Sequence, residues 1–435
     1  MIDSPSVALA ARGSAVVRGR TAAVAVTGEG LALIATVAAV AMLPLLVPRG
    51  PANTAPVDLL IGGAIATVLL WAVANRRELS FPYAVPVGLF MLGGAVGALA
   101  GPVPRAGIVA LVQDLVLVAW CWALVNMCRS PSHALTLIRT WAYSSIAWAT
   151  LLFIGLVVGS TALTGQTDKN ATRTSLTLVD PSVSASYYFI SIMLIWASGY
   201  PRRRPYRIAA YAVLAAAIVS TGSNSGAVSV AVGVTVAALL ALHRRFGLAP
   251  TVAAGAFVVL AGSLVSSTFS MTAIQNRAGE SKWSFVREGV GRSDVSAEQR
   301  GMLRRESVRL YTTGGVLGEG PVSTKARLER DLAPFAKEAH DDYFAALLER
   351  GALGVLGLIL LVGAVAIRGV AIARAGLRSV TLVVPRPHAL AGAIAGTLVA
   401  MTVYELLHVR HVWALFAFVA ALHLWSREWQ QPSPS

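Results

Sequence analysis

The sequence AHDDYFAALLERGALGVLGLILLVGAVAI, residues 339–367, passes from a polar stretch into a long apolar run. The apolar part, residues 345–367, is long enough to cross a membrane, because a spanning helix needs roughly 20 mainly apolar residues. Lipid offers the backbone no hydrogen-bonding partners, and a helix satisfies its polar groups internally. We therefore expect a transmembrane helix that begins directly after the polar residues around His340.

The composition extends this expectation to the whole chain. Hydrophobic residues make up 56% of the sequence and charged residues 13%, with a mean hydropathy of +0.66. Soluble globular proteins carry about 25% charged residues. We therefore predict an all-α integral membrane protein with about twelve transmembrane helices. The predicted segments are residues 27–47, 57–75, 83–100, 107–127, 135–158, 183–199, 206–221, 225–242, 250–267, 345–367, 387–407 and 411–425.

The positions of Lys and Arg predict the orientation of the chain in the membrane. A cytoplasmic N-terminus places eighteen of the 36 on the cytoplasmic side, five in short outer loops and thirteen in the long polar stretch before the tenth segment. Because cytoplasmic loops are enriched in Lys and Arg, we expect both termini inside and the long loop outside. The net charge of +15 is then mainly a topological signal. Nucleic-acid binding is disfavoured, because the inner basic residues are scattered over seven short segments.

Five parts of the chain follow from these segments. We expect a cytoplasmic N-terminal tail without a removable signal peptide, helices one to nine, a large and partly helical extracytoplasmic loop, helices ten to twelve, and a cytoplasmic C-terminal tail. Their bounds are residues 1–26, 27–267, 268–344, 345–425 and 426–435. Cys121 and Cys128 lie seven residues apart on one predicted helix, too far for a disulfide, so we expect them to be packing residues.

The long loop contains clustered arginines. The segment 295–315, VSAEQRGMLRRESVRLYTTGG, is predicted to be helical, with a capping box at its start. Arg300 and Arg304 then share one helix face, and Arg305 lies on the neighbouring face. Their planar guanidinium groups suit phosphate oxygens, and a lipid-linked phosphate at the membrane surface is a fitting partner. The alternative is an amphipathic helix resting on anionic lipid headgroups.

The loop ends with a histidine among carboxylates. After a non-helical turn at GGVLGEGPVS, residues 314–323, the chain reaches His340, which is followed by Asp341 and Asp342 and preceded by Glu338. Neighbouring carboxylates orient an imidazole and favour its cationic form, which suits a general base that takes a proton from a sugar hydroxyl. The alternative is a polar loop residue without a chemical role.

Two carboxylates lie at or inside predicted helices. Asp58 opens the second segment, where a solvated helix cap is the favoured interpretation and substrate contact the alternative. Asp114 lies several residues inside the fourth segment, where an unpaired carboxylate is costly. We expect it to face the interior and to bond to a neighbouring helix, with a direct chemical role as the alternative.

Further polar residues lie in the predicted outer loops. Lys169 belongs to a loop rich in Thr and Ser, and the turn at residues 220–229, STGSNSGAVS, contains Asn224. The glycines, hydroxyls and amides of this turn suit an anion or a sugar, although a plain turn between helices fits equally well. In the last outer turn, Arg410 is expected to pair with Glu405, with substrate contact as the alternative.

Several of these motifs resemble, in order, those of the O-antigen ligase and O-antigen polymerase superfamily of bacterial membrane enzymes. The matching segments are PVDLL (56–60), LVDPSVSASYY (178–188), STGSNSGA (220–227), DVSAEQRGML (294–303) with VLGEGP (316–321), and AHDDYFAALLERGALG (339–354). Three positions depart from the family pattern. Ser182 follows Asp-Pro in place of Asn, Asn224 stands in place of an arginine, and Asp341 stands in place of Asn.

The resemblance implies a GT-C-like fold in the bacterial cytoplasmic membrane and inverting, metal-independent glycosyl transfer without a cofactor. The donor would be a polyprenyl-linked glycan and the acceptor a hydroxyl of a glycan or lipid on the outer face. His340 matches the family's catalytic histidine, and Arg300, followed by Arg304 and Arg305, matches the arginine that binds donor phosphate. On this resemblance Asp58, Lys169 and Asn224 are candidate substrate contacts. Asp341, Asp342 and Arg410 complete this set.

Two other functions fit a polytopic protein of this kind. A lipid-linked glycan flippase is expected to have related halves and a site near the bilayer midplane, whereas here no repeat is evident and the polar residues gather outside. A peptidoglycan-type polymerase also uses a lipid-linked donor, but it is expected to depend on an outer-loop aspartate. Loss of activity in His340→Ala would therefore favour the ligase or polymerase function.

Overall fold

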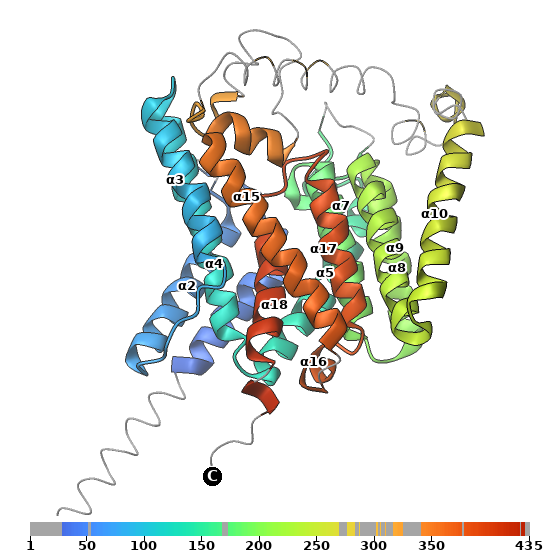
Figure 1. The fold of residues 1–435 in the computed structure, drawn as a ribbon, viewed down its shortest axis with the longest axis horizontal. Helices are drawn as coiled ribbons and strands as arrows, with labels where there is room; N and C mark the ends of the chain where they lie inside the picture. The colour runs from blue at the N-terminus through green and yellow to red at the C-terminus, as the bar shows by residue number, and fades with distance from the viewer. Residues whose placement is uncertain are drawn as a thin grey trace, which may run out of the picture.

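The computed structural model describes residues 28–50, 54–167, 173–268, 276–282, 287, 302, 305, 309, 316–324, 341–375, 378–426 and 428–430. These residues form helices and turns, with no β-strand among them (Figure 1). A helix coincides with each of the twelve predicted apolar segments. The twelve are Gly28–Ala41, α2 (Pro56–Ala74), α3 (Ala84–Ala100), α4 (Pro104–Met127), α5 (Pro131–Val158), α7 (Pro181–Ser198), α8 (Arg204–Thr221), α9 (Asn224–Phe246), α10 (Leu248–Thr268), α15 (Asp342–Ala375), α17 (Pro387–Ala400) and α18 (Arg410–Trp425).

Length and composition indicate which helices could cross a membrane. Among the described residues, α2, α4, α5, α9 and α15 are long and apolar enough to cross a membrane. Shorter apolar helices accompany them: Gly28–Ala41, α3, Leu248–Leu264 of α10, α17 and α18. Short helical turns lie between the long helices, namely α6 (Thr161–Thr164), η3 (Leu176–Leu178) and α16 (Arg378–Val383), and η4 (Glu428–Gln430) follows α18. In the part that the structure describes, the chain is thus a helical membrane protein.

The helices run back and forth between two ends of one bundle. We call the end that contains the starts of α2, α7, α9, α15 and α18 the loop end. The opposite end, where α7 and α18 stop and where α8 begins, is the basic end, because Arg139, Arg202, Arg207 and Arg386 gather there. Figure 1 shows the loop end at the top and the basic end at the bottom. The candidate functional residues belong to the loop end.

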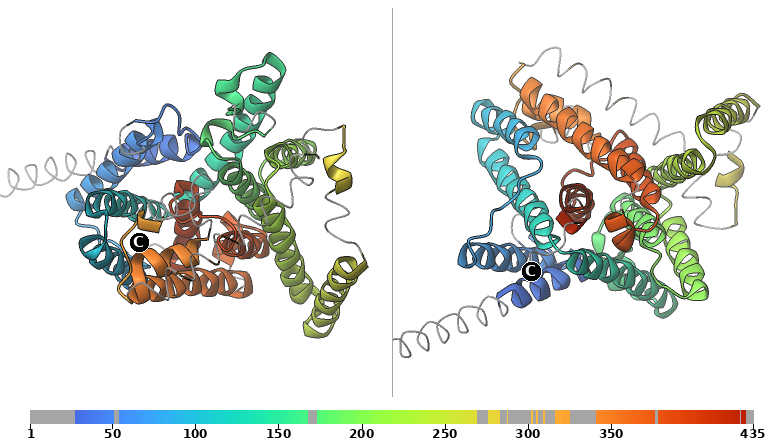
Figure 2. Two further views of the ribbon diagram at one scale, coloured as in Figure 1. Left: turned by 90° about the horizontal axis from the view of Figure 1, so that it is seen from above. Right: turned by 60° about the horizontal axis from the view of Figure 1, so that its bottom comes forward.

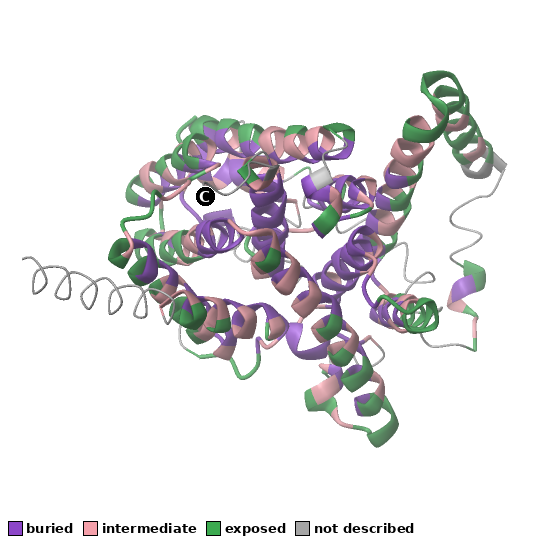
Figure 3. Cartoon of the chain, turned by 90° about the horizontal axis from the view of Figure 1, so that it is seen from below, coloured by how far each residue is buried: buried purple, intermediate pink, exposed green. Residues whose placement is uncertain are grey.

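Helix α18 is the centre of the bundle. Its sequence from His411 to Leu422 is buried on every side, because the helix is apolar all round and carries no polar stripe that would face solvent. In Figure 2 the other helices surround it, and in Figure 3 the buried residues concentrate around the same axis. Trp425 donates a hydrogen bond of 2.9 Å from Nε1 to the carbonyl of Val125, which fixes the end of α18 against α4.

Glycine allows a close contact between α9 and α17. A Cβ atom on Gly233 of α9 would lie 2.8 Å from the carbonyl oxygen of Gly392, and one on Gly392 of α17 would lie 2.3 Å from the carbonyl oxygen of Gly233. The two backbones therefore pack without side chains between them, as small residues permit between membrane helices. Phe189 of α7 fills the adjacent space, 2.5 Å from the same Cβ position on Gly233.

Two predicted segments are wrong in extent. The first, residues 27–47, is helical only over Gly28–Ala41, and turn and coil follow it. Residues 387–407 were expected to be one helix, but α17 ends at Ala400 and residues 401–409 are turns. Met401, Leu406 and Leu407 bond instead to Asp342 of α15. These contacts replace the hydrogen bonds that a longer helix would have made.

Candidate functional site

The first turn of α15 is fastened to residues 401–409. The Asp342 side chain is buried, and its carboxylate accepts hydrogen bonds of 2.7 Å from the Leu406 N–H and 3.1 Å from the Leu407 N–H. The Asp342 N–H donates to the Met401 carbonyl over 2.9 Å. Because a buried carboxylate is costly unless it is hydrogen-bonded, these contacts fix the segment that leads into α18.

Asp341 caps the same helix. Its Oδ1 atom accepts hydrogen bonds of 2.9 Å from the Tyr343 N–H and 3.1 Å from the Phe344 N–H, two groups that have no partner within the helix. The Tyr343 hydroxyl donates to the Leu398 carbonyl of α17 over 3.2 Å. The chain therefore enters α15 at a fixed point, directly after His340.

A bidentate ion pair joins the starts of α2 and α18. Arg410 Nε lies 2.8 Å from Asp58 Oδ1, and Arg410 Nη2 lies 2.6 Å from Asp58 Oδ2. The Ala55 N–H also donates to Asp58 Oδ2 over 2.8 Å, which confirms the predicted capping role. The side chain of Asp58 is only 20% exposed, so the prediction of a solvated cap is wrong. The ion pair of Arg410 is with Asp58 and not, as predicted, with Glu405.

The next residue of α18 reaches α7. His411 is buried, and its Nε2 atom lies 2.7 Å from the Ser186 hydroxyl. Since that hydroxyl lies 2.7 Å from the Val183 carbonyl and donates to it, its oxygen is left to accept from the imidazole. Tyr187 packs against the edge of the imidazole with 5.5 Å between ring centroids. Arg410 and His411 therefore tie α18 to α2 and α7 at the loop end.

Hydroxyl groups connect the starts of α7 and α9. The Ser223 hydroxyl lies 3.2 Å from the Ser182 hydroxyl and 2.9 Å from the Ser225 hydroxyl, and Ser223 caps α9 by accepting from the Gly226 N–H over 3.3 Å. Asn224 is the first residue of α9 and is exposed beside this cluster. The turn is thus a helix start whose side chains also contact the preceding motif.

The segment 316–324 packs against helix α15 at a break in that helix. Gly351 has φ 63° and ψ −163°. This conformation is not helical, and its positive φ favours glycine over other residues. At this break the Ala352 N–H donates to the Val316 carbonyl over 2.9 Å. Glu319 and Gly320 donate to the carbonyls of Leu348 and Glu349 over 3.0 Å and 2.9 Å. The non-helical turn predicted here is confirmed, and it joins the long loop to the membrane helices.

The residue before this break carries a buried charge. Arg350 is 8% exposed, and its Nη2 atom lies 2.5 Å from Asp114 Oδ2 of α4. Its guanidinium carbon lies 3.9 Å from the centroid of the Phe90 ring of α3, a cation–π contact. The prediction that Asp114 bonds to a neighbouring helix is confirmed. Arg350 holds α3, α4 and α15 together beside the docked segment.

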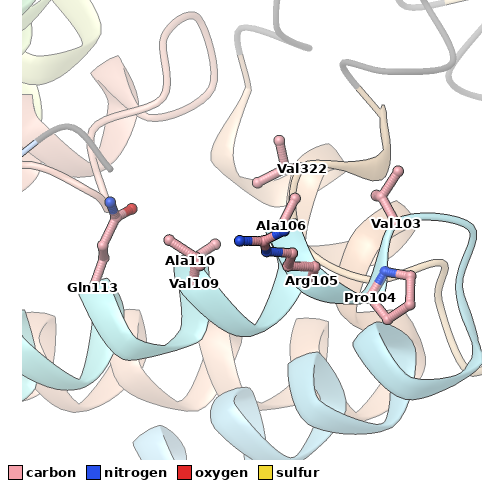
Figure 4. Close-up of a pocket in the computed structure, with 8 residues that line it drawn as sticks. All are labelled: Val103, Pro104, Arg105, Ala106, Val109, Ala110, Gln113 and Val322. Atoms are coloured by element: carbon pink, nitrogen blue, oxygen red, sulfur yellow. The ribbon is translucent and has the colours of Figure 1, made fainter. Parts of the chain in front are cut away.

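An apolar groove runs along the first three turns of α4 (Figure 4). Its volume is about 600 Å³. Val322 of the docked segment forms one wall, and Arg105 and Gln113 are its polar residues. The other residues that line it are Val103, Pro104, Ala106, Val109 and Ala110.

The structure brings some of the predicted site residues together. Asp58 and Arg410 are in direct contact, and Asp342 holds the segment that leads to Arg410. Arg305 is helical and exposed, as are Met302 and Arg309. The predictions for Lys169, Arg300, Arg304 and His340 lie outside the described residues.

Other contacts at this end were not predicted as site features. The sequence signal for Arg350 was an arginine inside an apolar run, between Glu349 and Gly351. His411 gave a weaker signal, because a histidine at a helix start is commonly solvated. In the described part of the chain, His, Cys, Asp and Glu form no group of three or more that could hold a metal ion. Cys121 and Cys128 are both free and buried, as expected for packing residues.

Comparison of the chain with protein-family models and with curated proteins gave no match. The assignment of a function therefore rests on the residues and their arrangement.

Proposed function

We propose that the protein is a membrane glycosyltransferase of the O-antigen ligase and polymerase type. It would transfer a sugar or glycan from a polyprenyl phosphate or pyrophosphate to an acceptor hydroxyl on the outer face of the cytoplasmic membrane. Both termini would be cytoplasmic, and all twelve apolar helices would cross the membrane in a GT-C-like arrangement.

One observation carries the proposal. The described segments that resemble this superfamily are far apart in the sequence, yet they contact one another or common partners at the loop end. Ser182 meets Ser223, and the segment 316–320 bonds to residues 348–352. Asp58 forms an ion pair with Arg410, and Asp342 accepts a hydrogen bond from Leu406 in the segment before Arg410. Such convergence is expected of a functional site and is not needed for membrane insertion alone.

The chemistry follows from a good leaving group. A polyprenyl phosphate departs readily once its charge is neutralised, and planar guanidinium groups provide that neutralisation. In this proposal Arg300, Arg304 and Arg305 bind the phosphate oxygens, and His340 takes the proton of the acceptor hydroxyl. The bond from the anomeric carbon to the phosphate oxygen breaks as the bond to the acceptor oxygen forms on the opposite face.

The described residues would position these groups. Asp341 and Asp342 fix the start of α15 directly after His340, and the docked segment 316–324 fixes the chain between the arginines and that histidine. The apolar groove beside α4 offers a surface for part of the polyprenyl chain. Rigid support of this kind keeps reacting groups within the narrow range that transfer requires.

The test uses a deletion strain that carries the wild-type protein or His340→Ala. Mature surface glycan and polyprenyl-linked glycan on each membrane face are measured, with His408→Ala as a control for loss of a histidine elsewhere at the loop end. The expected result is a folded His340→Ala protein that loses mature glycan and accumulates the lipid-linked intermediate on the outer face. Accumulation only on the cytoplasmic face would indicate a flippase, and full activity would refute the role of His340.

A further inference from the structure

At the basic end, four arginines gather around the turn that ends α7. Arg139 Nη2 and Arg202 Nε both donate to the Tyr200 hydroxyl, the second over 3.1 Å. Their guanidinium carbons lie 4.4 Å and 5.5 Å from the centroid of the Tyr200 ring. Tyr200 thus holds two cations, one from α5 and one from the turn itself.

The other two arginines flank Gly199. Arg207 Nη1 donates to the Gly199 carbonyl over 2.8 Å, and Arg386 Nη1 donates to the Trp196 carbonyl over 3.3 Å. A Cβ atom on Gly199 would meet nothing closer than Arg386 Nη1 at 3.7 Å and Arg207 Nη1 at 3.9 Å. The backbone at Gly199 is therefore open, with a guanidinium group on either side.

Among the described residues, no carboxylate forms an ion pair with this cluster. None of the ion pairs in the described part of the chain involves Arg139, Arg202, Arg207 or Arg386. Besides Tyr200, the titratable neighbours are Tyr211, which interacts electrostatically with Arg207 and Arg386, and His388, which interacts with Arg386 and with a fifth arginine, Arg244. Neither neighbour supplies a carboxylate.

Capping of α7 explains only part of the arrangement. Arginines at a helix end satisfy its last carbonyls and oppose the negative end of the helix dipole. Each guanidinium has five N–H donors, however, and the capping contacts use one nitrogen each on Arg207 and Arg386. Arg139 Nε is buried and has no hydrogen-bonding partner among the described residues. The cluster therefore has donors left for an anion.

The exposed apolar side chains beside the cluster favour an anion that carries acyl chains. Tyr206 and Ile208, next to Arg207 on α8, are 59% and 56% exposed, as expected where a helix meets the apolar part of a bilayer. A phosphate with attached acyl chains would contact both the guanidinium groups and this apolar surface. Basic pockets between helices on one membrane face are suited to such headgroups.

We propose that Arg139, Arg202, Arg207 and Arg386 bind the phosphate headgroup of an anionic phospholipid at Gly199. The recognised chemistry is a phosphate group held by several guanidinium groups, with acyl chains along α8. This inference is independent of the proposed glycosyl transfer, because the cluster lies at the opposite end of the bundle from the candidate functional site.

The test is a titration of the full-length protein, in detergent, with phosphatidylglycerol or with zwitterionic phosphatidylcholine, with bound lipid counted by native mass spectrometry. Arg207→Gln/Arg386→Gln is expected to weaken phosphatidylglycerol binding by roughly tenfold or more. The matched control is Arg76→Gln/Arg77→Gln, which removes the same charge from exposed positions at the end of α2 and is expected to change binding less than about twofold.

Two further arms keep the test decisive. Arg202→Gln removes an exposed arginine of the cluster and is expected to weaken binding even if the first variant unfolds. Inorganic phosphate at millimolar concentration is expected neither to displace phosphatidylglycerol nor to stabilise the wild type. Equal losses in the cluster and control variants would overturn the proposal, and so would equal binding of phosphatidylcholine. Displacement by inorganic phosphate would show that the cluster takes a soluble anion instead of a lipid.

Discussion

Asp342 Oδ2 accepts a hydrogen bond of 2.7 Å from the backbone N–H of Leu406, 64 residues later in the chain. This contact joins the helix that follows the long loop to the segment that carries Arg410. The position of Arg410 at the start of α18 therefore depends on a carboxylate that directly follows Asp341 and His340 in the sequence.

Replacement of Asp342 with Asn is expected to destabilise the protein by about 1 to 3 kcal/mol, because the new amide NH2 group would face backbone N–H donors. Hydrogen exchange at the Leu406 and Leu407 amides should become faster. The adjacent Asp341→Asn is the control, since Asn also caps helices well and should change stability by less than about 0.5 kcal/mol. Similar effects of the two substitutions would contradict the contacts assigned to Asp342.

Arg410→Gln should lower the stability by about 1 to 3 kcal/mol, because it removes two charge-assisted hydrogen bonds to Asp58. Thermal unfolding in detergent measures the change. Arg49→Gln, which removes an exposed arginine near the same end, should leave the unfolding midpoint nearly unchanged. The exchanged pair Asp58→Arg/Arg410→Asp should recover part of the loss, and no recovery would indicate that geometry outweighs charge at this site.

Gly351→Ala should prevent the segment 316–320 from docking in α15. An alanine Cβ would lie 2.3 Å from the Val316 carbonyl oxygen, and the backbone there has a positive φ that alanine rarely adopts. We expect a loss of several kcal/mol in stability and cleavage by proteases between residues 316 and 324. Gly363→Ala in the same helix is the control, because nothing lies within 4 Å of its Cβ position and alanine favours helix.

Arg350→Met should cost about 3 to 5 kcal/mol, because it leaves the Asp114 carboxylate without its cationic partner inside the bundle. Asp114→Leu should be similarly harmful, since it strands the guanidinium group. The double variant Asp114→Leu/Arg350→Met is expected to be more stable than either single variant, as apolar replacement of a buried pair often is. Additive losses in a double-mutant cycle would refute the coupling between these two residues.

The sequence predicted the helices well, because continuous apolar runs report directly on membrane insertion. The end of α17 was missed, since residues 401–407 are apolar enough to continue a helix and their partner, Asp342, is distant in the chain. The break at Gly351 was also missed. A glycine inside an apolar run is common in membrane helices, and only the docked segment 316–320 reveals that the backbone changes direction there.

Pairing between polar residues was harder to predict than their location. Glu405 was the nearer partner for Arg410 in sequence, but the arrangement of the helices brings Asp58, 352 residues away, within 2.6 Å. Asp114 needed a partner by its depth in the membrane, and the sequence did not indicate that Arg350 on α15 would supply it. The arginines around Gly199 were assigned to topology alone, because their convergence depends on α5, α7, α8 and α17 together.

The central position of α18 also has a consequence for how the protein is made. This helix follows the other eleven in the chain, yet it supplies the axis on which α4, α7, α15 and α17 pack. During synthesis the earlier helices reach the bilayer while the middle of their assembly is still vacant. Because α18 is buried on every side, we expect α4, α7, α15 and α17 to reach their final packing only after α18 has been made.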